Sequence, residues 1–226
     1  MGFQDKDLDS LTYLEEQLEP ERVVIISCEG RNTEPEYFKA LVDELSEHIS
    51  ELVEVKVIPK NDNASEPKDV VRNLDVFLKD NFDFKTGYDE MWVVVDREKV
   101  EQRKMGILDV IPQCKKKNYK IILTNPLFEF WLLLHIADIS NYAFSDLYEN
   151  KKVNTKRRFI DKELSNLLKT RGGYNKKKGK FNKIIISEEN VRRALKQEQE
   201  FENDIVKIID HLGSNVGTLV KRILNF

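Results

Sequence analysis

Four short apolar segments alternate with stretches of helical periodicity between residues 20 and 140, and this order limits the folds open to the chain. The segments RVVIISC (22–28), EMWVVVD (90–96) and YKIILT (119–124) are continuous apolar runs, whereas VEVKVIP (53–59) alternates. Such patterns are typical of strands. The stretches near 33–45, 68–82 and 101–117 are predicted helices. Strand–helix alternation predicts an α/β fold with a mainly parallel sheet flanked by helices.

The strand pattern fades beyond residue 140, where three segments have helical character. They are KRRFIDKELSNLLKT, SEENVRRALKQEQEFEN and NVGTLVKRILNF, and the glycine- and lysine-rich RGGYNKKKGK lies between the first two. The organisation expected from these patterns is an acidic lead-in (1–20), an α/β core (21–140) and a mainly helical, basic C-terminal region (141–226).

The charge of the chain is distributed unevenly. The net charge is −3, but residues 151–183 hold thirteen Lys or Arg against two acids, so this segment is +11 and the remainder −14. A local basic face attracts phosphate even when the whole protein is acidic. A solvated helical face followed by a lysine-rich loop gives the same composition, so charge alone leaves both interpretations open.

Composition excludes several classes of protein. No secretory signal is recognisable in the acidic first residues, and the apolar run LFEFWLLLHIA is interrupted by Glu129 and His135 and too short for a bilayer span. The two cysteines, Cys28 and Cys114, form no CxxC motif and are expected to be buried small side chains. A soluble, cytoplasmic protein is therefore expected, without a disulfide framework or a cysteine zinc site.

Two of the predicted strands end in acidic residues. Glu29 follows the first strand, and Asp96 ends the third with Glu98 two residues later. Ligands of parallel sheets bind beyond the carboxyl ends of the strands. Residues i and i+2 of extended backbone point the same way, so Asp96 and Glu98 are expected to reach one ion together with Glu29. Oxygen ligands suit Mg²⁺ or Mn²⁺. The alternative is that these acids cap the helices that follow.

Three motifs give the chain a family resemblance. VIISCEGRNTEPEYF, MWVVVDRE and TNPLFEFWLLLHI, in this order, together with GGYNKKKGK and GTLVKRIL, resemble the RloB-like proteins over most of residues 22–226. The resemblance implies a Toprim-like α/β fold, in which a glutamate at a strand end and an Asp-x-Asp pair hold Mg²⁺ for phosphodiester chemistry. This pattern maps onto Glu29, Asp96 and Glu98. Glu98 stands where an aspartate is usual, which leaves open whether it contacts the metal directly.

Further residues of these motifs are candidates for the site. Glu34 opens the predicted TEPEYF helix, either as an additional acid of the site or as part of the helix cap. Thr33 and Glu36 are predicted to form a capping box. Glu129 is an acid in an otherwise apolar helix, and a buried acid needs a partner or a metal. Asn125 and Pro126 resemble the cap and first turn of this helix, and His135 is expected to be a core histidine.

The lysine-rich loop supplies basic residues for a nucleic-acid partner. Glycines allow close approach of the backbone, lysines neutralise phosphate, and tyrosine can stack on a base. With the resemblance, a loop that contacts substrate is favoured over a solvated loop. The residues predicted to bind nucleic acid are Tyr174, Lys176, Lys177, Lys178 and Lys180.

These observations lead to the hypothesis of a metal-dependent nuclease that hydrolyses nucleic-acid phosphodiesters. The predicted catalytic acids are Glu29, Glu34, Asp96, Glu98 and Glu129. By analogy with Toprim effectors, RNA or tRNA is favoured over DNA, and the resemblance implies an anti-phage defence effector beside an ATPase partner. The chain lacks a GxxxxGK[ST] motif, so ATP-driven sensing would have to come from that partner.

Two other functions stay open on the sequence alone. The first is a non-catalytic module that binds RNA or a partner through its basic face, with the acids serving structure. The second is a phosphotransfer or nucleotide-binding enzyme on the same fold.

Overall fold

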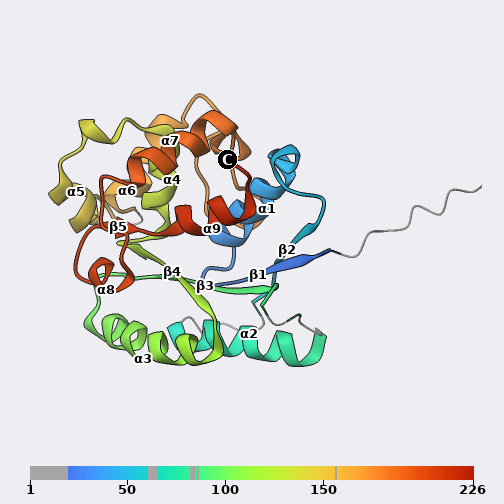
Figure 1. The fold of residues 1–226 in the computed structure, drawn as a ribbon. Coiled ribbons are helices and arrows are strands. Elements are labelled where there is room, and N and C mark those ends of the chain that lie inside the picture. Colours follow the sequence, from blue (N-terminus) through green and yellow to red (C-terminus); the bar gives the residue numbers. More distant parts are fainter. Residues whose placement is uncertain (1–19, 61–65, 82–84, 86, 156) are drawn as a thin grey trace, which may run out of the picture.

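The computed structural model describes residues 20–60, 66–81, 85, 87–155 and 157–226, so the acidic lead-in predicted for 1–20 lies almost wholly outside the described residues. Within the described residues, five strands form one sheet in the order β2-β1-β3-β4-β5 (Figure 1). The strands are β1 (Arg22–Cys28), β2 (Val53–Val57), β3 (Glu90–Asp96), β4 (Lys120–Asn125) and β5 (Gly213–Ser214). The first four are parallel, whereas β5 is antiparallel to β4. The predicted α/β fold is confirmed, and it agrees with the Toprim-like architecture.

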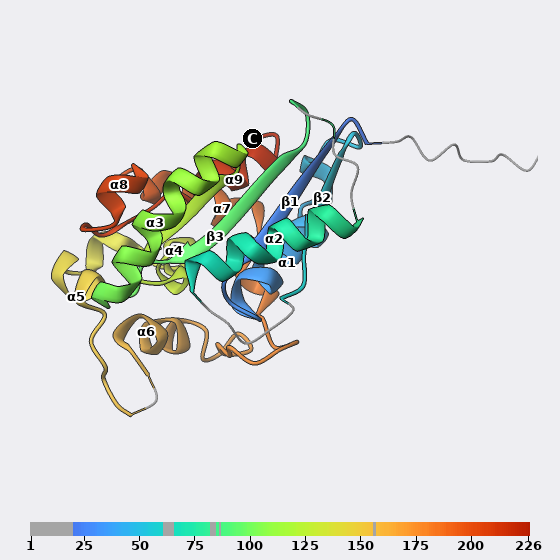
Figure 2. The same ribbon diagram turned by 90° about the horizontal axis from the view of Figure 1, so that it is seen from below.

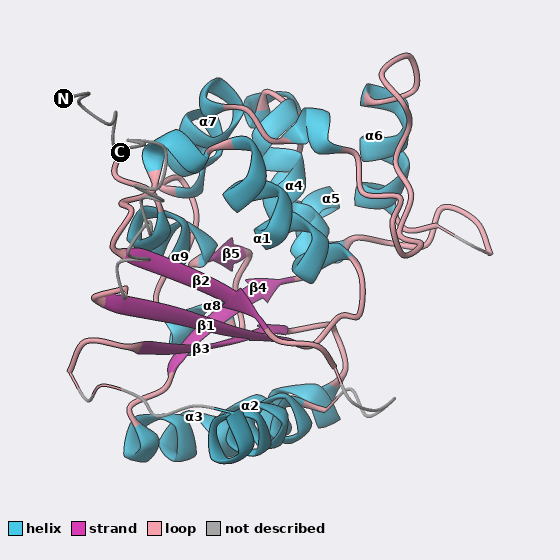
Figure 3. Ribbon diagram, turned by 90° about the vertical axis from the view of Figure 1, so that its right-hand side faces the viewer, coloured by secondary structure: helices cyan, strands magenta, loops and turns pink. Residues whose placement is uncertain are grey.

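Helices cover both faces of the sheet. Two helices, α2 and α3, lie against one face, and α1, α4, α7 and α9 lie over the other (Figure 3). The helices are α1 (Thr33–Glu44), α2 (Pro67–Asn81), α3 (Glu101–Lys117), α4 (Phe128–Ile136), α5 (Phe144–Glu149), α6 (Phe159–Leu167), α7 (Glu188–Glu198), α8 (Ile205–Ile208) and α9 (Val216–Ile223). No described helix combines the length and the apolar character needed to cross a lipid bilayer.

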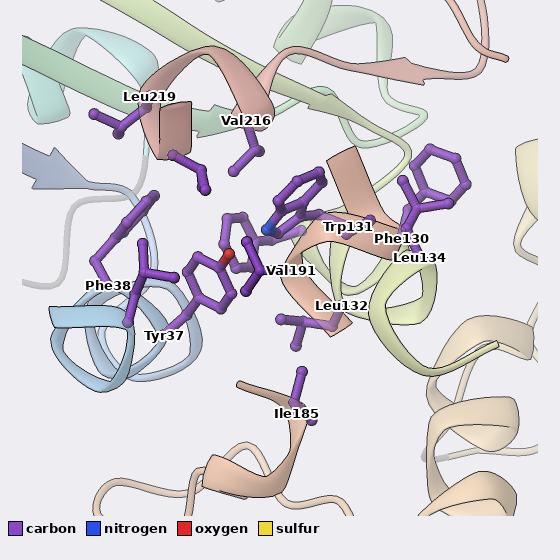
Figure 4. Close-up of a cluster of buried hydrophobic side chains, with 14 of the residues drawn as sticks. Tyr37, Phe38, Phe130, Trp131, Leu132, Leu134, Ile185, Val191, Val216 and Leu219 are labelled. Carbon is purple, nitrogen blue, oxygen red and sulfur yellow. The ribbon is translucent and has the colours of Figure 1, made fainter. Parts of the chain in front are cut away.

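Each face of the sheet has its own hydrophobic core, because both sides of β1, β3 and β4 are apolar. The larger core joins α1, α4, α7 and α9 through side chains such as Tyr37, Trp131, Val191 and Leu219 (Figure 4). The smaller core packs α2 and α3 on the opposite face. His135 lies in the larger core, as predicted. It contacts the Tyr37 hydroxyl and the Trp131 carbonyl, and burial lowers its pKa to about 4. The two cysteines are buried and unpaired, also as predicted.

Two predicted helix caps are wrong. Asn32 precedes α1 without a side-chain capping bond, and Glu36 makes no capping box, because its carboxylate accepts hydrogen bonds from the distant amides of Gly179 and Phe181. Asn125 does not cap α4, which begins at Phe128. It is the last residue of β4, and its amide donates to the carbonyls of residues 208 and 211, at 2.7 and 2.9 Å.

The region 141–226 belongs to the same folded unit as the α/β core. It contributes β5 to the sheet, and α7 and α9 to the larger core. Asn215, just after β5, binds the backbone of β4 at Leu123 (2.7 Å) and Ile121 (3.0 Å). The sequence did not indicate this pairing, because a strand of two residues has no periodicity to detect.

Glu198 links α7 to the start of α9 and gives a first prediction. It is 7% exposed and accepts hydrogen bonds from the Ser214 hydroxyl and the Gly217 amide, and burial raises its pKa to about 7. An acid with a raised pKa holds its proton longer in the folded state, so folding stability falls as pH rises from about 4.5 to 7. From pH 5 to pH 8, the unfolding free energy of a Glu198→Gln variant should rise relative to that of the wild type by about 2–3 kcal/mol. Chemical denaturation at both pH values measures this, and Glu200→Gln, an exposed neighbour, should show no such change.

Candidate active site

One pocket at the carboxyl ends of the strands collects the acids predicted for the site. Its volume is about 380 Å³, and Glu29, Glu34, Asp96, Glu98 and Glu129 all line it. We call it the acidic pocket. These residues come from the ends of β1 and β3 and from the first turns of α1 and α4. In Figure 2, α6 and the loop before it lie beyond this end of the sheet. The sequence prediction that these acids share one crevice therefore agrees with the structure.

Glu29 is held at the end of β1 by contacts from two elements, β3 and α3. Its amide donates to the Val94 carbonyl at 3.0 Å, and its carboxylate accepts from the Asp96 amide at 3.2 Å. The carboxylate also forms an ion pair with Arg103 of α3, and both side chains are close to 10% exposed. Arg103 was not identified from the sequence, because a lone basic residue in a predicted helix carries no signal of its own.

Asp96 is surrounded by both hydrogen-bond donors and other acids. Its carboxylate accepts hydrogen bonds from the Thr124 hydroxyl and from the amide of Phe128, the first residue of α4. Burial, followed by the nearby charges of Glu34 and Glu129, nevertheless raises its pKa well above the usual range. Acids this crowded need either a proton or a cation to balance their charge.

Glu98 lines the pocket, but its backbone conformation differs from the extended one that was predicted. The strand β3 ends at Asp96, and Glu98 has a φ of 37°, so the argument from extended backbone does not hold. The turn is fixed by the buried Arg97, whose guanidinium donates to the Ile209 carbonyl at 2.8 Å and to Val100 at 3.0 Å. A left-handed conformation is uncommon for glutamate and marks a position held by its surroundings. Glu98 is exposed at the pocket.

Glu34 is buried beside Gly30 rather than acting as a helix cap at the surface. Its carboxylate accepts from the Gly30 amide at 3.1 Å, and burial together with Glu129 raises its pKa to about 7. A Cβ at position 30 would lie 1.9 Å from a carboxylate oxygen of Glu34. The glycine in the CEG motif is therefore explained by the space that Glu34 occupies.

A Gly30→Ala variant tests this packing. The added methyl group forces Glu34 out of its place, and we expect a loss of about 1–3 kcal/mol in unfolding free energy. When Glu34 is already truncated, the added methyl group has room. The Gly30→Ala/Glu34→Ala protein should therefore be almost as stable as Glu34→Ala alone. Urea denaturation of all four proteins gives the coupling energy, and strictly additive effects would contradict the explanation.

Glu129 is paired with other side chains of the protein. The sequence had left open whether it has such a partner or binds a metal. The Tyr174 hydroxyl donates to its carboxylate at 2.9 Å, and Lys176 lies 2.8 Å from the same oxygen. Lys176 also pairs with Asp161 at 2.8 Å. Tyr174 is half-buried against the larger core. Its hydroxyl is engaged by Glu129 and its ring is half-buried, so its stacking on a base stays a prediction.

The rest of the lysine-rich loop lies outside the acidic pocket. Lys177, Lys178 and Lys180 are exposed and do not line it, so Lys176, which is already paired, is the lysine of this loop that reaches the pocket. The nucleic-acid contacts of the other three stay a prediction. The loop is instead fastened to α1. Glu36 accepts its backbone amides, and the side chain of Asn32 donates to the Lys176 carbonyl at 2.9 Å.

The basic side of the pocket comes from residues that the sequence analysis did not single out. Lys152, Arg157 and Arg158 line it together with the acids, and we call these three residues the basic rim. Their hairpin-like loop closes with a bridge between Lys152 and Arg158 just before α6. The sequence showed the excess charge of 151–183, but it gave no means to separate these residues from the lysines of 176–180.

Comparison with known proteins identifies the family. The model of the RloB-like protein family matches residues 24–223. The chain belongs to the RloB-like family. No curated protein and no solved structure matches it significantly. The family match extends from β1 into the last turn of α9, so it includes the acidic pocket, the basic rim and the lysine-rich loop.

The acidic pocket of this RloB-like protein has the donor chemistry for a hard divalent cation. All five acids offer oxygen, and the raised pKa values of Asp96 and Glu34 indicate that the protein's own cations do not balance them. Among the described residues, however, no three acids, histidines or cysteines stand in metal-binding geometry. Binding of a cation therefore requires side chains to rearrange, and Glu29 and Glu129 are the acids now paired with Arg103 and Lys176.

Proposed function

We propose that this RloB-like protein is a metal-dependent nuclease that hydrolyses phosphodiester bonds. One observation carries the proposal: five carboxylates at the carboxyl edge of a parallel sheet share a pocket with the three residues of the basic rim. Such a pocket suits a polyanionic substrate together with a cation. A substrate with neither phosphate nor other anionic groups would not use the basic rim.

The residues divide into roles by their surroundings. Glu29, Asp96 and Glu98 would hold one or two Mg²⁺ or Mn²⁺ ions. When bound, such an ion polarises the phosphoryl oxygen and lowers the pKa of the attacking water. Glu34, whose pKa is raised to about 7, is suited to accept or donate a proton near neutral pH. The basic rim would hold the backbone of the substrate.

RNA, and tRNA in particular, is the favoured substrate, with DNA as the second choice. We further propose that the protein is an anti-phage defence effector that works with an ATPase partner. These two statements rest on analogy with Toprim effectors and on the family resemblance, and the substrate assay below distinguishes RNA from DNA directly.

The test is a cleavage assay on the purified protein. tRNA, single-stranded DNA and plasmid are each incubated with Mg²⁺, Mn²⁺ or EDTA, and we expect cleavage with a metal and none with EDTA. Cleavage that continues in EDTA would contradict the metal role. Because a partner can control activity, toxicity on co-expression with the neighbouring genes is the second readout, compared between wild-type and Glu29→Gln proteins.

A non-catalytic RNA- or partner-binding module is the second candidate. The observation in its favour is that Glu29 and Glu129 are each paired with a basic side chain, as structural acids would be. RNA binding without cleavage under any metal condition, together with no toxicity on co-expression, would favour this function.

A further inference from the structure

A second pocket adjoins the acidic pocket. Its volume is about 300 Å³, and it lies between α6 and the lysine-rich loop, with Ser165, Tyr174 and Asn175 in its wall. Arg157, Asp161 and Lys176 line both pockets. The two spaces are therefore neighbours with a shared wall, and a chain molecule in one can continue into the other past these three residues.

Among the shared residues, Arg157 alone is a cation available to an anion. Lys176 is held between Glu129 and Asp161, and Asp161 is itself an acid. The described residues include no ion-pair partner for the Arg157 guanidinium, which is exposed. Its backbone is fixed, because the Arg157 amide donates to Asn154 at 2.8 Å and its carbonyl accepts from Val153 at 3.0 Å. An available guanidinium on a fixed backbone is well suited to bind phosphate in a bidentate manner.

The second pocket offers polar groups of the kind that contact a nucleoside. Asn175 accepts from the Lys177 amide at 2.9 Å through its carbonyl oxygen, and its NH₂ group has no acceptor among the described residues. The Ser165 hydroxyl donates to the Asp161 carbonyl at 2.8 Å, which leaves its lone pairs as acceptors. A donor and an acceptor in one small pocket match the edge of a nucleobase or a ribose.

We propose that Arg157 binds the phosphate that joins two nucleotides of a single strand, one at the acidic pocket and the next in the second pocket. This inference deepens the proposed function and rests on it for the placement of the first nucleotide. Two separate pockets require neighbouring nucleotides to leave their stack, which a single strand allows and a duplex resists. Arg157 is then a substrate-binding residue, whereas Lys176 is an internal counter-ion.

Binding of labelled 12-nucleotide single strands, one RNA and one DNA of equal sequence, tests the proposal. Fluorescence anisotropy is measured across KCl concentrations on the Asp96→Asn protein, which removes a catalytic acid and leaves the basic rim intact. Adding Arg157→Gln should weaken binding about tenfold and reduce the slope of log affinity against log salt by about 1. Arg157→Lys should recover part of the loss. Lys162→Gln, an exposed residue of α6 outside both pockets, should bind within about twofold of the parent.

The outcomes separate this proposal from the nuclease itself. Selective loss with Arg157→Gln in a protein that neither cleaves RNA or DNA nor is toxic on co-expression supports the binding role and contradicts the nuclease. Equal binding by Arg157→Gln and Lys162→Gln, at unchanged melting temperature, overturns the binding role even if the wild type cleaves. Loss on Lys178→Gln instead, or no binding of either strand by the parent, overturns it as well. The strand that binds more tightly shows whether the site prefers ribose or deoxyribose.

Discussion

Replacing Asp96 by asparagine should reduce cleavage by about 10²–10³-fold, the cost of removing one preorganised charged group from an active site. Asparagine keeps the size of the side chain and can still bond to Thr124 and Phe128, which contact Asp96 from β4 and α4. It removes the charge that a cation needs. Glu29→Gln should have a similar effect, because it changes the same edge of the sheet.

The measurement is the initial rate of substrate cleavage in Mg²⁺ or Mn²⁺, beside the melting temperature of each variant. Glu51→Gln is the matched control, since it neutralises an exposed acid outside the pocket and should leave the rate unchanged. Full activity of both Asp96→Asn and Glu29→Gln would remove the metal assignment. If a variant loses activity and also melts at a lower temperature, the substitution has disturbed the fold rather than the chemistry.

Replacing Lys176 by methionine should lower the unfolding free energy by about 1–3 kcal/mol, because Glu129 remains behind as a buried acid without its charged partner. The Glu129 side chain is 7% exposed, and among the described residues the Tyr174 hydroxyl would be its remaining side-chain donor. The methionine keeps most of the apolar stem of lysine. The effect therefore reports mainly the charge.

The second substitution in this test is Glu129→Gln. In the Lys176→Met/Glu129→Gln protein the charge of Glu129 is gone and only Asp161 has lost its partner, so much of the lost stability should return, as urea denaturation will show. Lys177→Met is the control, being the exposed neighbour of Lys176 outside both pockets. Equal losses in the single and double variants would mean that Lys176 acts through packing rather than through Glu129.

The sheet could be predicted because its strands are encoded locally. The continuous apolar runs that became β1 and β3 need burial on both faces, and only a sheet covered by helices on each side provides it. Glu29 and Asp96 follow from the same argument, since each stands where such a strand ends. The position of an acid relative to its strand is enough to place it at the carboxyl edge.

The partners of these acids could not be predicted, because they come from distant parts of the chain. Arg103 pairs with Glu29 across 74 residues, and Lys176 with Glu129 across 47. Glu36 had the spacing of a capping box, but the amides of a loop more than 140 residues away compete successfully for its carboxylate. A local sequence pattern shows which neighbouring residues a side chain can bind. The partners of these three acids are instead set by tertiary contacts.

The pairing of β5 with β4 limits how much of the sheet can be completed while the chain is still being synthesised. The open edge of β4 is covered by residues 213–215, which follow it by about 90 positions in the chain. While the ribosome is still adding these residues, β4 presents unpaired backbone groups and the larger core lacks α9. An uncovered sheet edge favours association with other chains. A nascent chain should therefore depend on chaperones until this segment emerges, and the acidic pocket should become complete only after most of the protein has been made.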